Sequence, residues 1–270
     1  MYSTALSLVL LMACLLFASS GCASNDNWGR ASVIRNGQDW QVTLENNQLF
    51  VQYSPARTNG LTKDRITEFR LKNPKRIIAT ALDGRHGDKD QAFFRMSDAS
   101  VTGETADRKT VRLVFDKRVE HVSILKDMPV IEIKYEQGGH NLDYRITGDT
   151  YVFFGEQAWQ ASRGWDKKHP TLRDEYDPTG SYYRAEWGGP SILGYKGWMI
   201  MGFYDSQTGL GVGMILPANV VRWIKLVAWG RLGGFERWMV GKHRSYLYAV
   251  TGGAEEILSM GKKLAETVPK

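Results

Sequence analysis

The chain has 270 residues, and its 35 Lys and Arg face 29 Asp and Glu, which gives a net charge of +6. This length suits one large domain with an ample core, and the twelve Tyr and nine Trp are many for it. Both cysteines, Cys14 and Cys22, lie at the start of the chain. The composition therefore excludes a fold stapled by disulfides, and burial alone must stabilise the rest of the chain.

An apolar run opens the chain. Leu6–Ala18 is almost unbroken in apolar residues and is followed by Ser19-Ser20-Gly21-Cys22. The run has the length of a signal-peptide core and is too short to span a bilayer comfortably. Small residues before one cysteine resemble the lipobox of bacterial lipoproteins. This resemblance implies that residues 1–22 form a signal peptide and that Cys22 carries a lipid.

The alternative is ordinary secretion with cleavage near Ala23. In both cases we expect an exported protein. With the lipid anchor it would be a periplasmic or cell-surface lipoprotein of the outer membrane.

A polar segment follows. Residues 23–38 are rich in Asn, Ser and Gly, which is typical of a tether, and residues 39–270 then form one domain. Trp40, Val42 and Leu44 alternate with polar residues. The alternation resumes after Asn46-Asn47 and therefore predicts a β-hairpin.

The rest of the domain repeats this two-residue alternation between turn residues, with a loop expected at 83–88. Ala254–Val268 differs, because its apolar residues have helical spacing. Gly209–Gly213 is followed by Pro217 and no helix, so its glycines are interpreted as structural. The pattern predicts an all-β sandwich or barrel with one C-terminal helix. The predicted strands are Val111–Phe115, Val119–Leu125, Val130–Tyr135, Tyr151–Phe154, Trp198–Tyr204, Gly209–Leu216 and Tyr246–Thr251.

Three segments resemble pieces of galactose-mutarotase-like β-sandwiches: Lys126–Tyr135, the hairpin Gly197–Gly213, and the closing strand and helix Tyr246–Ala265. The resemblance implies a large antiparallel supersandwich of the kind found in sugar epimerases, polysaccharide lyases and glycoside hydrolases. His140 lies in Gly-Gly-His-Asn, which differs from the Asn-His-Ser/Thr context of true epimerases. A lyase or hydrolase is therefore favoured over a sugar mutarotase.

The richest stretch for chemistry is Gly155–Trp187, which mostly lacks strand periodicity and is expected to be a long loop. Its Trp and Tyr rings suit sugar faces, while its charged groups suit hydroxyls and carboxylates. Two acids could hydrolyse a glycosidic bond, or a Tyr or His base beside Arg could drive a lyase. The alternative is a loop with its own small core. The candidate catalytic residues are Glu156, Arg163, His169, Tyr183 and Glu186, and the candidate substrate-binding residues are Trp159, Trp165, Tyr182 and Trp187.

A second stretch, Arg222–Arg244, interleaves basic and aromatic residues, with Glu236 as its one acid. Arg222, Trp223, Arg237 and Trp238 are its candidate substrate-binding residues. In an exported protein such a tract favours an acidic sugar polymer over nucleic acid. The alternative is a pair of strands with a buried aromatic face and a solvated basic face.

These observations predict an exported protein that acts on an acidic, uronate-containing glycan by lyase or glycoside hydrolase chemistry. The alternatives are a non-catalytic glycan-binding lipoprotein on the same fold and a structural envelope protein. The expected partners are a glycan and, through the lipid anchor, a membrane. No cofactor, metal or nucleic acid is expected, since the five His lack the paired spacing of metal sites.

Overall fold

The computed structural model describes residues 28–58, 61–73, 76–79, 81–85, 95–115, 118–137, 141–147, 152–154, 157–159, 173–176, 182–188, 195–205, 208–229, 232–239 and 243–269. For residues 76–79, 81–85, 141–147, 152–154, 157–159, 173–176, 182–188, 221–229 and 232–239 it describes the backbone. The predicted Cys22 lipidation site therefore lies outside the described residues.

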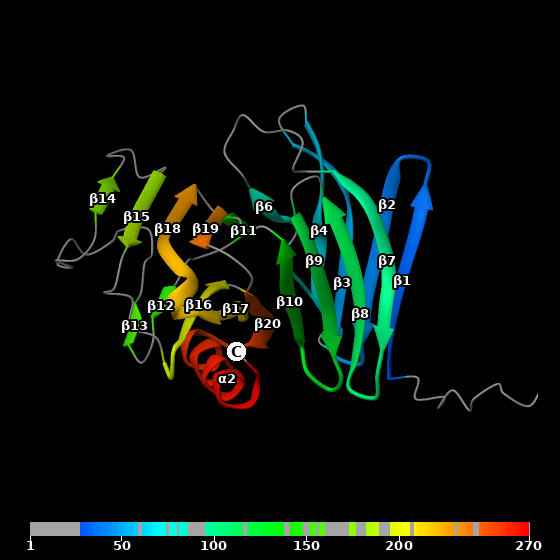
Figure 1. The fold of residues 1–270 in the computed structure, drawn as a ribbon. Helices are drawn as coiled ribbons and strands as arrows, with labels where there is room; N and C mark the ends of the chain where they lie inside the picture. Colours follow the sequence, from blue (N-terminus) through cyan, green and yellow to red (C-terminus); the bar gives the residue numbers. More distant parts are fainter. Residues whose placement is uncertain are drawn as a thin grey trace, which may run out of the picture.

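The larger sheet has eleven antiparallel strands and runs the length of the molecule (Figure 1). Its strand order is β1-β2-β3-β4-β6-β11-β19-β18-β15-β14, with β5 beside β4. In chain order the strands are β1 (Gly29–Asn36), β2 (Asp39–Asn46), β3 (Leu49–Thr58), β4 (Leu61–Leu71), β5 (Arg76–Ala79), β6 (Ala81–Arg85), β11 (Asn141–Thr147), β14 (Arg173–Tyr176), β15 (Tyr182–Gly188), β18 (Val221–Trp229) and β19 (Leu232–Met239).

The smaller sheet has seven antiparallel strands in the order β16-β17-β20-β10-β9-β8-β7. In chain order they are β7 (Met96–Glu104), β8 (Arg108–Phe115), β9 (Arg118–Leu125), β10 (Val130–Gln137), β16 (Trp198–Asp205), β17 (Leu210–Pro217) and β20 (Arg244–Thr251). Three shorter or separate elements complete the fold: the hairpin β12 (Val152–Phe154) and β13 (Gln157–Trp159), the 3-10 helix η3 (Ala218–Val220), and helix α2 (Ala254–Thr267). The predicted all-β sandwich with one C-terminal helix is confirmed.

The alternation seen in the sequence places one face of each strand in the core between the sheets. Val42, Leu44 and Val51 of the larger sheet pack in one cluster with Val122 and Ile131 of the smaller sheet, and all five are fully buried. Burial of this apolar area, worth about 25 cal/mol per Å², is the main force that holds the two sheets together.

The smaller sheet also buries part of its outer face, because α2 packs on β16, β17 and β20 (Figure 1). Ile257 and Leu264 of α2 meet Trp198, Tyr246 and Tyr248 there, all fully buried. The Tyr248 hydroxyl donates a hydrogen bond of 2.7 Å to the Ile257 carbonyl. Burial raises the pKa of the Tyr248 phenol, so this hydroxyl stays a donor.

The glycines of the Gly209–Gly213 motif permit this contact. Leu210 and Val212 point into the core between the sheets, so Gly211 and Gly213 lie on the face toward α2. A Cβ at Gly211 would meet Ile257, and a Cβ at Gly213 would overlap the Tyr248 ring. The structural interpretation of this motif fits the observed packing.

Two expectations about irregular segments were wrong in part. Gly29–Asn36, assigned to the polar tether, forms β1 and pairs with β2 along its whole length. Its polar composition reflects an edge strand, with only Ala31 and Val33 packed against the core. Residues 83–85 of the expected 83–88 loop end strand β6.

The segment Gly155–Trp187 was expected as a long loop, yet parts of it form β13, β14 and β15. In β15 Tyr183, Ala185 and Trp187 alternate with two charged residues, but this alternation covers only five residues and did not stand out as a strand signal. Pairing with β18 decides the structure there.

We predict that Gly213→Ala lowers the free energy of unfolding by about 1–3 kcal/mol, because the added methyl group overlaps the fully buried Tyr248 ring. Gly103→Ala in the same sheet is the matched control, since its Cβ would lie 3.9 Å from Thr110, an ordinary contact. Urea denaturation of the purified proteins measures both. Equal stability of the two variants would contradict this account of the packing under α2.

Candidate functional site

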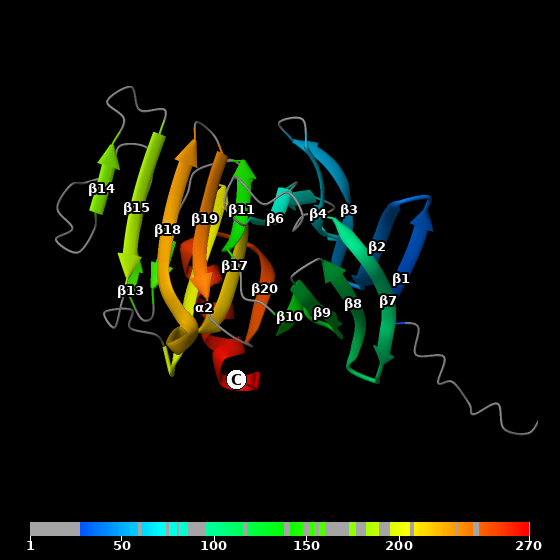
Figure 2. The ribbon, with the colours of Figure 1, turned by 45° about the horizontal axis from the view of Figure 1, so that its top comes forward.

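The larger sheet brings together the two stretches that the sequence singled out. Strands β14 and β15 come from the first stretch, β18 and β19 come from the second, and the four lie side by side (Figure 2). Tyr182 pairs with Trp229, and Trp223 pairs with Trp238. Since these positions are an even number of residues apart along each strand, all four occupy one face of the sheet.

We call this surface the aromatic face, defined by the positions Tyr182, Trp223, Trp229 and Trp238. Its two aromatic pairs are separated by six residues along β18, or about 20 Å. Between them a row of charged positions crosses the four strands. In order, the row is Arg173, Glu186, Lys225 and Glu236.

This register places acids beside the one lysine of the row. Lys225 has Glu186 opposite it on one neighbouring strand and Glu236 on the other. The last residue of the tract, Arg244, belongs to the smaller sheet. The positive charge at Lys225 is therefore flanked by negative charge on both neighbouring strands.

The candidate residues do not all share the aromatic face. Tyr183, Trp187 and Arg237 occupy the opposite face, because they alternate with Tyr182, Glu186 and Trp238 along their strands. Tyr183 and Glu186 therefore cannot act together on one substrate from one side of the sheet.

Other candidates are placed elsewhere or lie outside the described residues. Arg222 lies at a bulge of β18, and Trp159 lies opposite Val152 in the small β12–β13 sheet. The candidates Glu156, Arg163, Trp165 and His169 lie outside the residues that the structure describes.

A group of buried polar side chains that the sequence alone did not reveal lies between the sheets. Arg118 and Glu120 of β9 point inward, where Arg118 Nε approaches Glu120 Oε2 at 3.4 Å and the guanidinium covers the Phe115 ring at 3.8 Å. Tyr135 lies opposite Glu120 and stacks on His243 with 4.4 Å between ring centroids. We call Arg118, Glu120, Tyr135 and His243 the inter-sheet cluster.

The polar end of the core extends to the larger sheet. Buried Asp64 accepts hydrogen bonds from the Met96 amide (2.7 Å) and Arg95 Nε (3.0 Å). Burial raises the pKa of the Asp64 carboxyl, and this effect outweighs those two bonds. Met96 lies opposite Phe115, and the Phe115 ring is covered by Arg118. Asp64 and the inter-sheet cluster therefore lie at the same end of the sandwich.

An acid, a phenol, an imidazole and a guanidinium within one buried group are the residue types of proton-transfer chemistry. Their burial keeps a polymer from reaching them in this conformation, since Tyr135 is 1% and His243 7% exposed. Glu120 and Arg118, charged residues at inward positions of an apolar strand, are the sequence signal that could have revealed the cluster.

The opposite end of the sandwich is held by Asn46, the last residue of β2. Its amide nitrogen donates to the carbonyls of Leu125 (2.6 Å) and Met128 (2.7 Å) in the β9–β10 turn. Its oxygen accepts from the amides of Gln48 (2.8 Å) and Leu49 (2.7 Å). One buried side chain thus connects turns of both sheets.

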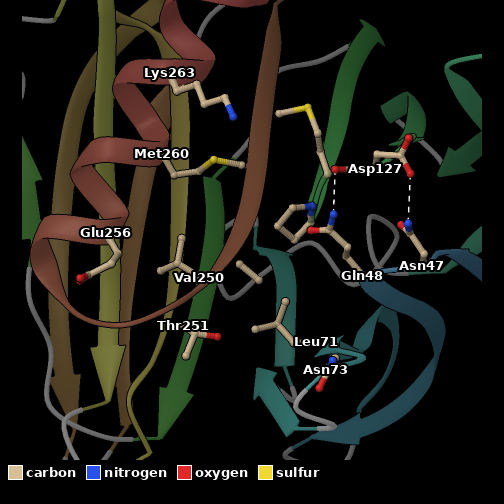
Figure 3. Close-up of a pocket in the computed structure, with 13 residues that line it drawn as sticks. Asn47, Gln48, Leu71, Asn73, Asp127, Val250, Thr251, Glu256, Met260 and Lys263 are labelled. Atoms are coloured by element: carbon tan, nitrogen blue, oxygen red, sulfur yellow. Dashed lines mark hydrogen bonds between the residues drawn. The ribbon is translucent and has the colours of Figure 1, made fainter.

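Beside Asn46 lies a groove of about 650 Å³ between these turns and α2 (Figure 3). Asn47 and Gln48 hold Asp127 on one wall, through hydrogen bonds of 3.0 and 2.8 Å. Met260 and Lys263 of α2 form the other wall. The described residues that line the groove include amides and aliphatic groups but no aromatic ring, so it lacks a platform for a sugar face.

The described residues contain no cluster of three His, Cys, Asp or Glu that could hold a metal ion. Nor does any helix among them have the length and apolar character needed to cross a membrane.

No family model and no curated protein matches the chain. Among solved structures, it is similar to a TPR-domain containing protein from Parabacteroides distasonis, with a TM-score of 0.55 and 10% identity, over 80% of this chain and 48% of that chain. The chain thus spans about half the length of that protein. At this identity the likeness shows the fold alone.

Two further solved structures are similar at lower scores. A putative aldose 1-epimerase from Klebsiella pneumoniae has a TM-score of 0.45 and 8% identity, over 88% of this chain and 87% of that chain. The periplasmic domain of YidC from Thermotoga maritima has a TM-score of 0.43 and 9% identity, over 88% of this chain and all of that chain.

We predict that Asn46→Ala lowers the free energy of unfolding by about 2–4 kcal/mol, because two carbonyls and two amides lose their partner at a buried site. Asn47→Ala is the control: it removes one exposed hydrogen bond and should cost less than about 0.5 kcal/mol. Denaturant titration tests the pair. A small loss for Asn46→Ala would mean that the turns are held by other contacts.

Proposed function

We propose that this chain is an exported carbohydrate-active protein that binds an acidic glycan on the aromatic face of its larger sheet. The register of β14, β15, β18 and β19 carries this proposal. It gathers Tyr182, Trp223, Trp229 and Trp238 on one face, although they come from stretches far apart in the sequence. Likeness of fold alone would not support it, since one fold hosts many functions.

The chemistry of the face suits a sugar chain. Aromatic rings stack on the apolar C–H faces of sugars, and charged groups bind hydroxyls and carboxylates. The aromatic pairs lie about 20 Å apart with the charged row between them, so the face suits an extended polymer better than a single sugar. The net charge of +6 favours an acidic polymer.

The same register bears on catalysis. Glu186 and Glu236 lie two strands apart, about 10 Å, on either side of Lys225. That separation is near the upper range of an inverting glycosidase pair. Sugar binding needs only rings and charged groups on one face, whereas hydrolysis also needs a pair of carboxylates at a set separation. Binding is therefore the better supported function, and hydrolase or lyase chemistry is the second candidate.

The test is a panel of polygalacturonate, alginate and a neutral glucan, with affinity, released reducing ends and ultraviolet absorbance of unsaturated products all followed. We expect polygalacturonate or alginate to bind, with affinity falling as salt rises. Trp223→Ala and Trp238→Ala should each weaken binding by about 1–3 kcal/mol.

Trp28→Ala, at the start of β1, is the matched control and should bind normally. Unchanged affinity in both aromatic-face variants, with the fold intact by circular dichroism, would remove the site from this face. Product release by the wild type would establish the enzymatic alternative. Tighter binding of the neutral glucan, with no dependence on salt, would contradict the proposal that the ligand is acidic.

We also propose that Cys22 anchors the protein to a membrane through a lipid, which the lipobox-like sequence supports. Cys22→Ser is expected to move the protein from the membrane fraction to the soluble fraction after cell breakage. Immunoblotting of the two fractions measures this. A wild type that is already soluble would contradict the anchor and leave ordinary secretion.

A further inference from the structure

The outer face of the smaller sheet is only partly covered. Helix α2 contacts β16, β17 and β20, and β7, β8 and β9 lie beyond it (Figure 1). The C-terminal end of α2 reaches β20, where the Tyr246 hydroxyl donates to the Pro269 carbonyl at 3.2 Å. Next to this point, on the same face, basic residues cross the sheet.

The register aligns these residues in one row. Arg112 lies opposite His121, His121 opposite Lys134, and Lys134 opposite Arg244. All four lie on the outer face, because Leu113, Val122 and Ile133, which alternate with them, point into the core. We call them the basic row. Neighbouring strands are about 4.8 Å apart, so the row spans about 14 Å.

The row is accessible to a partner. Lys134 is exposed and Arg244 is half-buried. The side chains of Arg112 and His121 are 33% and 29% exposed. Within the part of the chain that the structure describes, Lys134 takes part in no ion pair.

Acidic groups offset only part of this charge. Glu136 accepts a hydrogen bond from His121 Nε2 at 3.0 Å and lies 3.7 Å from Arg112 Nε. The hydrogen bond from His121 and the charge of Arg112 lower the pKa of Glu136, so it is ionised. The other acid nearby, Glu132, lies 3.3 Å from Arg108. Lys134 thus remains available to an outside anion, and Arg244, which hydrogen-bonds Tyr246, has further guanidinium donors to offer.

Hydroxyl groups lie along the next row of the same face. Thr110 and Ser123 share a hydrogen bond of 2.8 Å, and Tyr246 lies opposite Glu132. The described large apolar side chains that are exposed, Ile34 and Val101, belong to β1 and β7 and not to the row. A membrane-binding surface needs apolar groups that insert among the lipids, so the row fits a hydrated polymer better.

We propose that the basic row is a binding surface for a linear anionic polysaccharide, with the carboxylates of successive sugars beside Arg112, Lys134 and Arg244. Arg112 and Lys134 lie two strands apart, about 10 Å, and Lys134 and Arg244 one strand apart, about 5 Å, so these cations complement a polymer whose charges repeat at short intervals. The proposal rests on the proposed function for its ligand class. It adds a surface on the other sheet, in the half of the sandwich that the aromatic face does not occupy.

The test compares Arg112→Gln/Lys134→Gln with Arg30→Gln/Lys72→Gln. The control pair removes the same charge from the larger sheet, where both side chains contact Glu45. Binding of the full-length proteins to polygalacturonate is measured at low and physiological salt. The row variant should bind about fivefold more weakly at low salt, with a shallower salt dependence, and the control should stay within about twofold.

Equal affinity of the two double variants would overturn the proposal. Loss of binding to phosphatidylglycerol vesicles, with polygalacturonate binding unchanged, would assign the row to a membrane and overturn it as well. Lys134→Glu is a second variant, which leaves the contacts of Glu136 intact in case the double variant folds poorly.

The two proposals fail separately in this design. Trp223→Ala tests the aromatic face, and the row variants test the basic row. If Trp223→Ala binds polygalacturonate normally and the row variant binds it weakly, the aromatic face fails and the row stands. The reverse result leaves the aromatic face and removes the row.

Discussion

The structure depends on burial of the smaller sheet on both faces. Its inner face packs on the larger sheet and part of its outer face packs on α2, so β16, β17 and β20 form the middle of three layers. Residues on both faces of these three strands must then be apolar or small, as in β17, where every residue is buried. Glycine is needed where Tyr248 and Ile257 approach the backbone most closely. The proposed basic row lies on the smaller sheet beside α2, where this double burial ends.

Polar groups are distributed unequally between the two ends of the inter-sheet core. At one end the Asn46 side chain hydrogen-bonds four backbone groups and so joins a turn of the larger sheet to a turn of the smaller sheet. At the other end the core accommodates Asp64 and the inter-sheet cluster, including a buried ion pair. Desolvation makes such a buried ion pair a weak source of stability, so the apolar contacts of the core are the stronger link between the sheets.

The two proposed glycan surfaces use the same property of antiparallel sheets. Cross-strand register sets residues from distant parts of the chain about 4.8 Å apart, in rows on one face. On the larger sheet, charges of alternating sign lie in a row between two aromatic pairs. The charges suit sugar hydroxyls, and the aromatic pairs suit the faces of sugar rings. On the smaller sheet the row is mostly positive, which suits charge complementarity.

The sequence by itself determined the fold class, most strands of the smaller sheet, and the helix at 254–267, because periods of 2 and 3.6 residues are local. It missed β1, whose composition is largely polar, and β15, whose alternation covers only five residues. Only the tertiary structure decided that Tyr182 and Trp229 lie side by side, that Lys225 lies between two acids, and that Arg112 and Arg244 share a row. The reason is physical: alternation fixes which residues of one strand share a face, whereas strand order and register arise from contacts between distant segments.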